Sequence, residues 1–481
     1  MKKFQKAFWV VIALALTFCC GAVQADVKMP AVFASHMVLQ RELDTPVWGW
    51  AEQTETVTIT IAGPTKKATA GTDGKWFVRL DPVKAGGPYT MTVAGTKNKI
   101  VFEDVLFGDV WLCSGQSNMG FTVNRSVNAE KEIAAANFPN IRLLRIQTTS
   151  KALPQTDVPV TPWAACTPKT APSFTAVGFY FGRKLYQELN IPIGLINCSW
   201  GGSTCEAWMN GKVLAGYPDL APVADAKQIE KTKPHKKATY LYNGMIVPIC
   251  PFGIKGVIWY QGESNAGRAA QHEIMFPVMI QNWRDEWQQG DFPFYFVQLA
   301  NYRSIKDQPS ESAWAELRES QTRSLACRNS GEAVTIDIGE AEDIHPKNKQ
   351  DVGLRLAAMA LAKDYGKNVP YSGPRLHDMK VEGNKAIVSF DFVGTGLVAK
   401  GAKPDEGVKG FALAGPDQKF YWAKATIKDN TVVVSCPEVK RPWAVRYAWA
   451  DNPVCNLYNK EGFPACPFRT DRLPRITETA R

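Results

Sequence analysis

The sequence predicts an α/β domain, in which helices cover both faces of a parallel sheet, with a β-sandwich-like module on either side. Two observations support this prediction. Strand and helix patterns alternate between residues 101 and 366, and short strands separated by turns fill residues 26–100 and 367–481. A chain of 481 residues is also long enough for two to four domains. We therefore expect an N-terminal β module, a catalytic α/β domain and a C-terminal β module with these boundaries.

The N-terminus has the pattern of a secretory signal peptide. Three lysines precede an apolar run over residues 7–22, and Val23-Gln24-Ala25 forms a small-residue cleavage site. We expect a signal peptide over residues 1–25 and an exported mature protein, periplasmic or extracellular, without stable membrane insertion. Cys19 and Cys20 offer the alternative of a lipoprotein, which fits less well because a bulky residue precedes the first of them.

The N-terminal module shows period-two alternation at residues 56–61, a turn signal at Asp73-Gly74, and strand patterns at residues 76–80 and 89–93. Turns at such short intervals are typical of a sandwich or jelly roll. The C-terminal module has further strand patterns at residues 386–392, 432–436 and 444–450.

The central region alternates apolar strands with helical patterns. Strands are expected at residues 105–113, 141–146, 193–198, 254–260, 294–299 and 333–338. Helices are expected at residues 177–189, 273–287 and 313–327, and a last one should begin at Pro346.

The composition excludes several classes of function. The formal net charge is +10, but the basic residues are dispersed, which predicts no nucleic-acid partner. The mild positive charge is compatible with a small acidic substrate. Nine of the eleven cysteines follow the signal peptide and are scattered, so we expect buried free thiols with at most one disulfide. No CxxC pair or HExxH motif is present, and we predict no metal site and no cofactor.

Small and polar residues follow four of the predicted strands. They lie at residues 114–119, 199–203, 261–265 and 340–345. Because the carboxyl ends of parallel strands meet at one edge of a sheet, these segments should form one site.

The residues at this edge fit nucleophilic acyl transfer. Ser117 needs a base, usually a histidine that a carboxylate orients. His345 alone among the five histidines follows a strand of the α/β domain with acids, Glu342 and Asp343, directly before it. The sequence therefore predicts Ser117 as nucleophile and His345 as base.

The tetrahedral intermediate needs preorganised donors. Gly201 and Gly202 permit close approach of backbone N–H groups, although a plain tight turn explains them equally well, and Gln261 or Asn265 can supply an amide. Gly-Gln-Ser-Asn-Met around Ser117 is not the GxSxG elbow, which argues against a common α/β-hydrolase, lipase or protease.

At this point the chain resembles the bacterial sialate O-acetylesterases of the SGNH/GDSL hydrolase superfamily. The resemblance covers nearly the whole mature chain and rests on residues 36–41, 47–51, 108–119, 259–265, 343–349, 446–453 and 456–459. It implies a flavodoxin-like three-layer catalytic domain, and removal of O-acetyl groups from sialic acids without a cofactor.

Position by position, the resemblance implies that Ser117 is the nucleophile and that its own N–H belongs to the oxyanion hole. One of Gly201 and Gly202 takes the superfamily's glycine role, Gln261 stands where asparagine is usual, and His345 is the base. The superfamily spacing points to Glu342 as the acid, whereas the closer match to the esterases favours Asp343. A dyad with a backbone carbonyl orienting His345 is the third possibility.

Substrate identity stays open at this stage. Acetylated xylan or another glycan is the alternative substrate, and a carbohydrate-binding protein with an inert serine is the alternative class. Candidates for sugar contact are Trp200, Arg125 and Asn301, with Trp208 and Arg303 also near strand ends. An arginine fork would suit the carboxylate of a sialic acid, but the sequence does not say which arginine.

Overall fold

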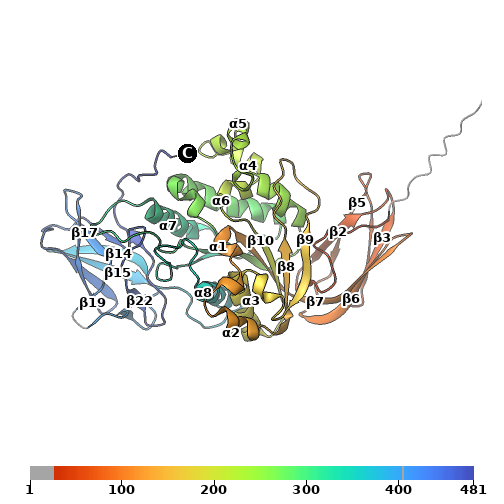
Figure 1. The fold of residues 1–481 in the computed structure, drawn as a ribbon, viewed down its shortest axis with the longest axis horizontal. Coiled ribbons are helices and arrows are strands. Elements are labelled where there is room, and N and C mark those ends of the chain that lie inside the picture. The colour runs from red at the N-terminus through yellow and green to blue at the C-terminus, as the bar shows by residue number, and fades with distance from the viewer. Residues whose placement is uncertain (1–25, 404–405, 481) are drawn as a thin grey trace, which may run out of the picture.

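The computed structural model describes residues 26–403 and 406–480. The predicted signal peptide lies outside the described residues. Figure 1 shows an α/β body between two β modules, one formed by the beginning of the described chain and the other by its end. The predicted α/β class with flanking β modules is therefore confirmed at this level.

The central sheet is mixed, with strand order β13-β12-β11-β7-β10-β8-β9. The pairings are parallel from β13 to β8, and β9 is antiparallel to β8. The strands are β7 (Lys99–Gly115), β8 (Phe138–Ile146), β9 (Val160–Cys166), β10 (Ile193–Ser199), β11 (Gly256–Tyr260), β12 (Phe294–Val297) and β13 (Ser330–Ala333).

Helices cover both faces because these strands are apolar on both sides. Along β7, Trp111 and Cys113 pack into one core with helices α3 and α8, whereas Val110 and Leu112 pack into another with α6. The four long helices are α3 (Ala176–Leu189), α6 (Ala269–Trp287), α7 (Ala313–Arg323) and α8 (Lys349–Lys363).

Strand β7 joins the N-terminal module to the central sheet. Its first half pairs with β6 (Gly86–Ala94) in antiparallel fashion, and its second half pairs with β10 and β11. A short strand, β1 (Val38–Gln40), lies parallel to the crossing point. The predicted boundary between residues 100 and 101 thus falls inside one unbroken strand, and the extent of the domains as folding units stays a prediction.

The two β modules are antiparallel. The N-terminal one pairs β2 (Thr45–Trp50) with β5 (Lys75–Leu80), and β3 (Thr56–Thr60) with β4 (Thr65–Thr69) and β6. In the C-terminal module, one four-stranded sheet comprises β14 (Arg375–Glu382), β15 (Lys385–Asp391), β20 (Thr431–Ser435) and β19 (Lys424–Lys428). The other comprises β18 (Phe420–Trp422), β17 (Phe411–Ala414), β21 (Ala444–Tyr447) and β23 (Phe468–Arg469), and both share one apolar core.

A buried arginine ties the C-terminal module to the body. Arg318 of α7 donates to the carbonyls of Leu299 and Ala300 after β12, and to those of Ala450 and Asp451 after β21. Four carbonyl acceptors compensate the cost of burying its charge.

Two sequence expectations were wrong in detail. The strand expected at residues 333–338 is β13, which ends at Ala333, because the chain then turns and Thr335 Oγ1 donates to the Gln298 carbonyl. Helix α8 begins at Lys349 rather than Pro346, since the Asn348 side chain caps it by accepting from the Asp351 N–H at 3.1 Å. Strand β9, at the edge of the sheet, is absent from the expected strands; it contains a proline, which an edge strand tolerates.

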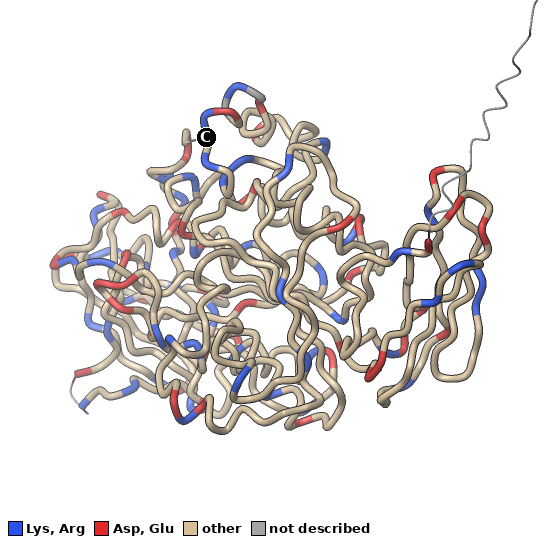
Figure 2. The backbone as a smooth tube through the Cα atoms, turned by 45° about the vertical axis from the view of Figure 1, so that its right-hand side comes forward, with Lys and Arg blue, Asp and Glu red and all other residues tan. Residues whose placement is uncertain are grey.

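Figure 2 shows Lys and Arg residues interspersed with Asp and Glu residues along the described backbone. Across the ranges that the structure covers, no helix is long and apolar enough to cross a membrane. The nine cysteines of those ranges are free thiols, and six of them are buried.

We predict that Gly108→Ala destabilises the protein at the point where β7 enters the central sheet. A Cβ at residue 108 would lie 2.0 Å from the Pro192 carbonyl oxygen, so backbone must move. Unfolding in urea should show a loss of about 1–3 kcal/mol, the usual cost of overpacking. Gly267→Ala is the control, because nothing lies within 4 Å of that Cβ; equal losses in both variants would contradict the prediction.

Candidate active site

Ser117 stands directly after the end of β7, where three strand ends are tied together. The Gln116 N–H donates to the Tyr260 carbonyl of β11, and the Trp200 N–H, just after β10, donates to the Gly115 carbonyl. Gly115 has φ +132°, and a Cβ there would lie 2.2 Å from the Tyr260 carbonyl oxygen. Only glycine fits this approach, which lets the chain turn into the short helix α1 (Ser117–Gly120).

His345 reaches Ser117 from the loop between β13 and α8. Its Nε2 lies 2.8 Å from Ser117 Oγ. With the ring proton on Nδ1, Nε2 accepts a hydrogen bond from the serine hydroxyl, as a general base requires. The tertiary structure thus brings together two residues that are 228 positions apart.

Asp343 is the carboxylate that contacts His345. Its Oδ1 accepts the backbone N–H of His345 at 2.8 Å and lies 3.5 Å from the ring Nδ1. The second distance is that of an ion-pair contact rather than a short hydrogen bond. Glu342 is exposed, and no contact between its side chain and His345 occurs in the described chain.

Burial lowers the pKa of His345 below its usual value, and the charges of Lys349 and Arg125 act in the same direction. The negative charge of Asp343 opposes them and raises this pKa. The ring is therefore neutral, and able to act as a base, over a wider pH range than a solvent-exposed histidine.

Asn118, next to the serine, links the site to a buried lysine and glutamate. Its Nδ2 donates to Glu263 Oε1 at 2.6 Å and to the Ile344 carbonyl at 3.0 Å. Its Oδ1 accepts from Lys349 Nζ at 2.6 Å. One amide therefore holds the serine turn, the histidine loop and the Gly262–Arg268 segment together.

The charges in this network are removed from water. Lys349 is fully buried, and burial lowers its pKa to about 7, although Glu263 pulls it upward. Burial likewise raises the pKa of Glu263, whose Oε2 is buried without a partner in the described chain. The lysine ammonium also lies 4.9 Å from the centre of the Phe121 ring, a cation–π distance.

The backbone N–H groups of Ser117 and of the Gly201-Gly202 turn have no hydrogen-bond acceptor within the described chain. Gly201 packs against the serine, since a Cβ there would lie 3.4 Å from Ser117 Cβ. Among the hydrogen bonds of residues 26–403 and 406–480, none engages the N–H of Ser117, Gly201 or Gly202. These groups can act as oxyanion donors.

Gln261 is placed differently from the expectation. Its Nε2 donates to the Ser203 carbonyl at 3.2 Å and to Asn265 Oδ1 at 2.7 Å, and the residue is fully buried. Both amide hydrogens are thus engaged. The geometry does not support Gln261 as an oxyanion donor; it instead braces the turn after β10 against the segment after β11.

The predicted sugar-contact residues differ in exposure and in their contacts with the rest of the protein. Trp200 is half-buried and lies against His235, with ring centres 6.2 Å apart. Arg125 is exposed and lies over the Phe121 ring. Asn301 donates through Nδ2 to Asn452 and accepts through Oδ1 from the Gly339 N–H, so its side chain is already engaged in hydrogen bonds within the protein.

The other two candidates also have protein partners. Trp208 is a buried core residue that donates to Ser203 Oγ, and exposed Arg303 pairs with Asp451 at 3.1 Å. Within the described chain, no cluster of three or more histidine, cysteine or acidic residues could hold a metal ion.

Comparison with known proteins agrees with this geometry. Residues 107–362, more than half of the chain, match the family described as "Carbohydrate esterase, sialic acid-specific acetylesterase". The chain belongs to this family. It is therefore a carboxylic ester hydrolase.

Relatives and a solved structure extend the match over most of the esterase's length. Human sialate O-acetylesterase is 33% identical over 493 residues, covering 91% of this chain and 92% of the human one. The mouse protein of that name is 32% identical, covering 90% and 92%. The crystal structure of XAC1771, titled a novel carbohydrate acetylesterase from Xanthomonas citri, superposes with TM-score 0.86 at 40% identity, covering 93% of this chain and all of that one.

Sequence reasoning missed the network behind the esterase's serine. Asn118, Glu263 and Lys349 all lie in the segments that carry the family resemblance, yet their types alone do not reveal a shared hydrogen-bond network. A lysine facing inward from an amphipathic helix was the one available signal, because lysine is almost never fully buried unless paired.

We predict that Asn118→Ala impairs both stability and turnover. It removes the amide that hydrogen bonds to Lys349, to Glu263 and to the Ile344 carbonyl in the interior, so unfolding should cost about 1–3 kcal/mol less. Misplacement of His345 should lower kcat by roughly a hundredfold with little change in KM. Exposed Asn137→Ala is the matched control, and an Asn118→Ala enzyme with normal kcat would contradict the prediction.

We predict that the acidic limb of the pH–rate profile belongs to His345. Activity should rise with pH as the ring loses its proton, with a midpoint below 6.5 because burial lowers its pKa. Asp343→Asn should move this midpoint further down, since a charge that favours the imidazolium is lost. Arg125→Met should move it up. Measurement of kcat/KM from pH 4 to 8 tests both signs, and an upward shift in Asp343→Asn would refute the assignment.

Proposed function

We propose that this esterase removes O-acetyl groups from sialic acids through an acyl-enzyme formed on Ser117. The observation that carries the proposal is the 2.8 Å contact between Ser117 Oγ and His345 Nε2 at the carboxyl edge of the sheet. Family membership supports the ester chemistry, and relatives named sialate O-acetylesterase support the substrate.

In the first half-reaction, His345 Nε2 takes the hydroxyl proton while Ser117 Oγ attacks the acetyl carbonyl. The N–H groups of Ser117 and of the Gly201-Gly202 turn stabilise the oxyanion. The bond from the carbonyl carbon to the sugar oxygen then breaks, and His345 gives its proton to that oxygen.

In the second half-reaction, water attacks the acetyl-enzyme with His345 again as base. Acetate leaves and the serine regains its proton. Asp343 orients the histidine and favours its charged form, and its contacts with both the N–H and the Nδ1 of His345 support this role over Glu342.

A second substrate class is another acetylated glycan. The solved relative from Xanthomonas citri is titled a carbohydrate acetylesterase, without restriction to sialic acid. In either case Arg125 and Trp200, beside the reacting residues, are the proposed sugar contacts.

We also propose that the catalytic sheet is flavodoxin-like and that the protein is exported. The order β10-β7-β11-β12-β13 supports the former, because it corresponds to 2-1-3-4-5 once β8 and β9 are counted as an added edge. The lysine-led apolar run over residues 1–25 supports the latter, with a periplasmic or extracellular location.

The decisive test is acetate release by the mature protein from O-acetylated sialic acid and from acetylated xylan. Ser117→Ala should abolish release, and Asp343→Asn should lower kcat by about 10⁴-fold at most, the effect seen when the acid of a serine triad is lost. Glu342→Gln is the matched control and should keep full turnover.

Each alternative gives a distinct result. Preference for xylan would keep the chemistry and change the substrate. Activity that survives in Ser117→Ala would mean that the site lies elsewhere, and full turnover in Asp343→Asn would reject that residue as the acid.

A further inference from the structure

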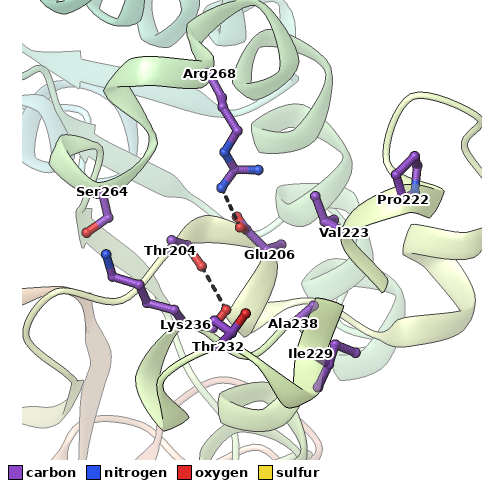
Figure 3. Close-up of a pocket in the computed structure, with 10 residues that line it drawn as sticks. All are labelled: Thr204, Glu206, Pro222, Val223, Ile229, Thr232, Lys236, Ala238, Ser264 and Arg268. Carbon is purple, nitrogen blue, oxygen red and sulfur yellow. Dashed lines mark hydrogen bonds and ion pairs between the residues drawn. The ribbon is translucent and has the colours of Figure 1, made fainter. Parts of the chain in front are cut away.

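A cavity of about 390 Å³ lies beside the glycine turn of the site. Its polar wall comprises Thr204, Glu206, Lys236, Ser264 and Arg268, and its apolar wall comprises Pro222, Val223, Ile229 and Ala238, with Thr232 beside them (Figure 3). The size is within the range of small-molecule sites, roughly 300–1,000 Å³. The cavity is therefore large enough for a sugar.

The cavity carries one unmatched positive charge. Arg268 pairs with Glu206 at 2.5 Å, and Asn265 Nδ2 donates to the other oxygen of that carboxylate at 3.0 Å. No ion pair or hydrogen bond of the Lys236 ammonium occurs among the residues described, and the side chain is half-buried. Figure 3 shows it extending toward the side that Ser264 and Thr204 line. An anion would complete this arrangement.

Short contacts connect the cavity to the nucleophile. Ser264 Oγ donates to the Gly202 carbonyl at 2.9 Å, and the neighbouring Gly201 packs against Ser117. His235, adjacent to Lys236 in the chain, lies against both Gly202 and the Trp200 ring. The glycine turn that would hold the oxyanion thus contacts Ser264, a residue that lines the cavity.

We propose that this cavity binds the acidic sugar that carries the scissile acetyl group, and that Lys236 binds its carboxylate. The inference rests on the proposed function and assigns the specificity for an acidic substrate to one residue. Ser264 uses its proton on Gly202, so its oxygen is free to accept a sugar hydroxyl. The apolar wall packs against the carbon face of the sugar.

Lys236→Met tests this proposal because it keeps the length of the side chain and removes the charge. The substrates are O-acetylated N-acetylneuraminic acid, its neutral C1 carboxamide, and 4-nitrophenyl acetate. The wild type should prefer the acid over the carboxamide. The variant should lose about ten- to a hundredfold in kcat/KM on the acid, through KM, because a hydrogen bond to a charged group is lost.

The same variant should act on the carboxamide and on 4-nitrophenyl acetate like the wild type, and Lys236→Arg should retain the preference. Lys233→Met is the control, an exposed lysine of the same segment. Calorimetric binding of the acid to Ser117→Ala, with and without Lys236→Met, gives a readout that is independent of turnover and should show the same loss.

Four outcomes would overturn the proposal. A loss of similar size on all three substrates would make Lys236 merely structural, and a charge-specific loss in Arg125→Met but not in Lys236→Met would move the carboxylate to the other side of the serine. A wild type that hydrolyses 4-nitrophenyl acetate but neither sialate would refute the proposed substrate and this site together. An unchanged Lys236→Met enzyme that still prefers the acid would refute the site alone.

Discussion

The architecture depends on the pairing of one 17-residue strand, β7, with neighbours from both the N-terminal module and the catalytic sheet. Its first half belongs to an antiparallel sheet, and its second half is the centre of a parallel one. The carboxyl end of a central strand has neighbours on both sides, so β10 and β11 bring their own loops to Ser117. At the end of the strand, Gly115 lies so close to the Tyr260 carbonyl that no side chain fits there. A rigid scaffold of this kind suits a site that must hold its groups within tenths of an ångström.

A network of buried polar and charged side chains lies beside Ser117 and His345 and holds their loops together. Burying a lysine and a glutamate costs folding free energy. This burial is tolerated here because Asn118 hydrogen bonds to both side chains and to the histidine loop. The same lysine lowers the pKa of His345, whereas Asp343 raises it. The basicity of His345 thus results from opposing neighbours rather than from a single partner. A change in the network should therefore alter both the position of His345 and its pKa.

The glycine turn after β10 lies between Ser117 and the proposed sugar cavity. Gly201 packs against Ser117, and the Gly202 carbonyl accepts a hydrogen bond from Ser264, which lines the cavity that contains Lys236. Gln261 contributes to neither chemistry directly, because its amide is used to brace this turn against the Asn265 segment. Rigidity of the turn would serve the proposed oxyanion hole and the proposed sugar site alike.

Patterns along the chain predicted the order of β and α/β regions, the nucleophile and histidine candidates, and their meeting at one sheet edge. They did so because hydrophobic periodicity is local and because parallel strands share a carboxyl edge. Three-dimensional contacts were needed to distinguish Asp343 from Glu342 and to show that the Gln261 amide hydrogen bonds to Asn265. The hydrogen bonds of Asn118 with Lys349 and Glu263 likewise appear only in the folded chain. Hydrogen bonds between segments 145 or 231 residues apart depend on distances of a few tenths of an ångström, and no pattern of residue types along the chain encodes them.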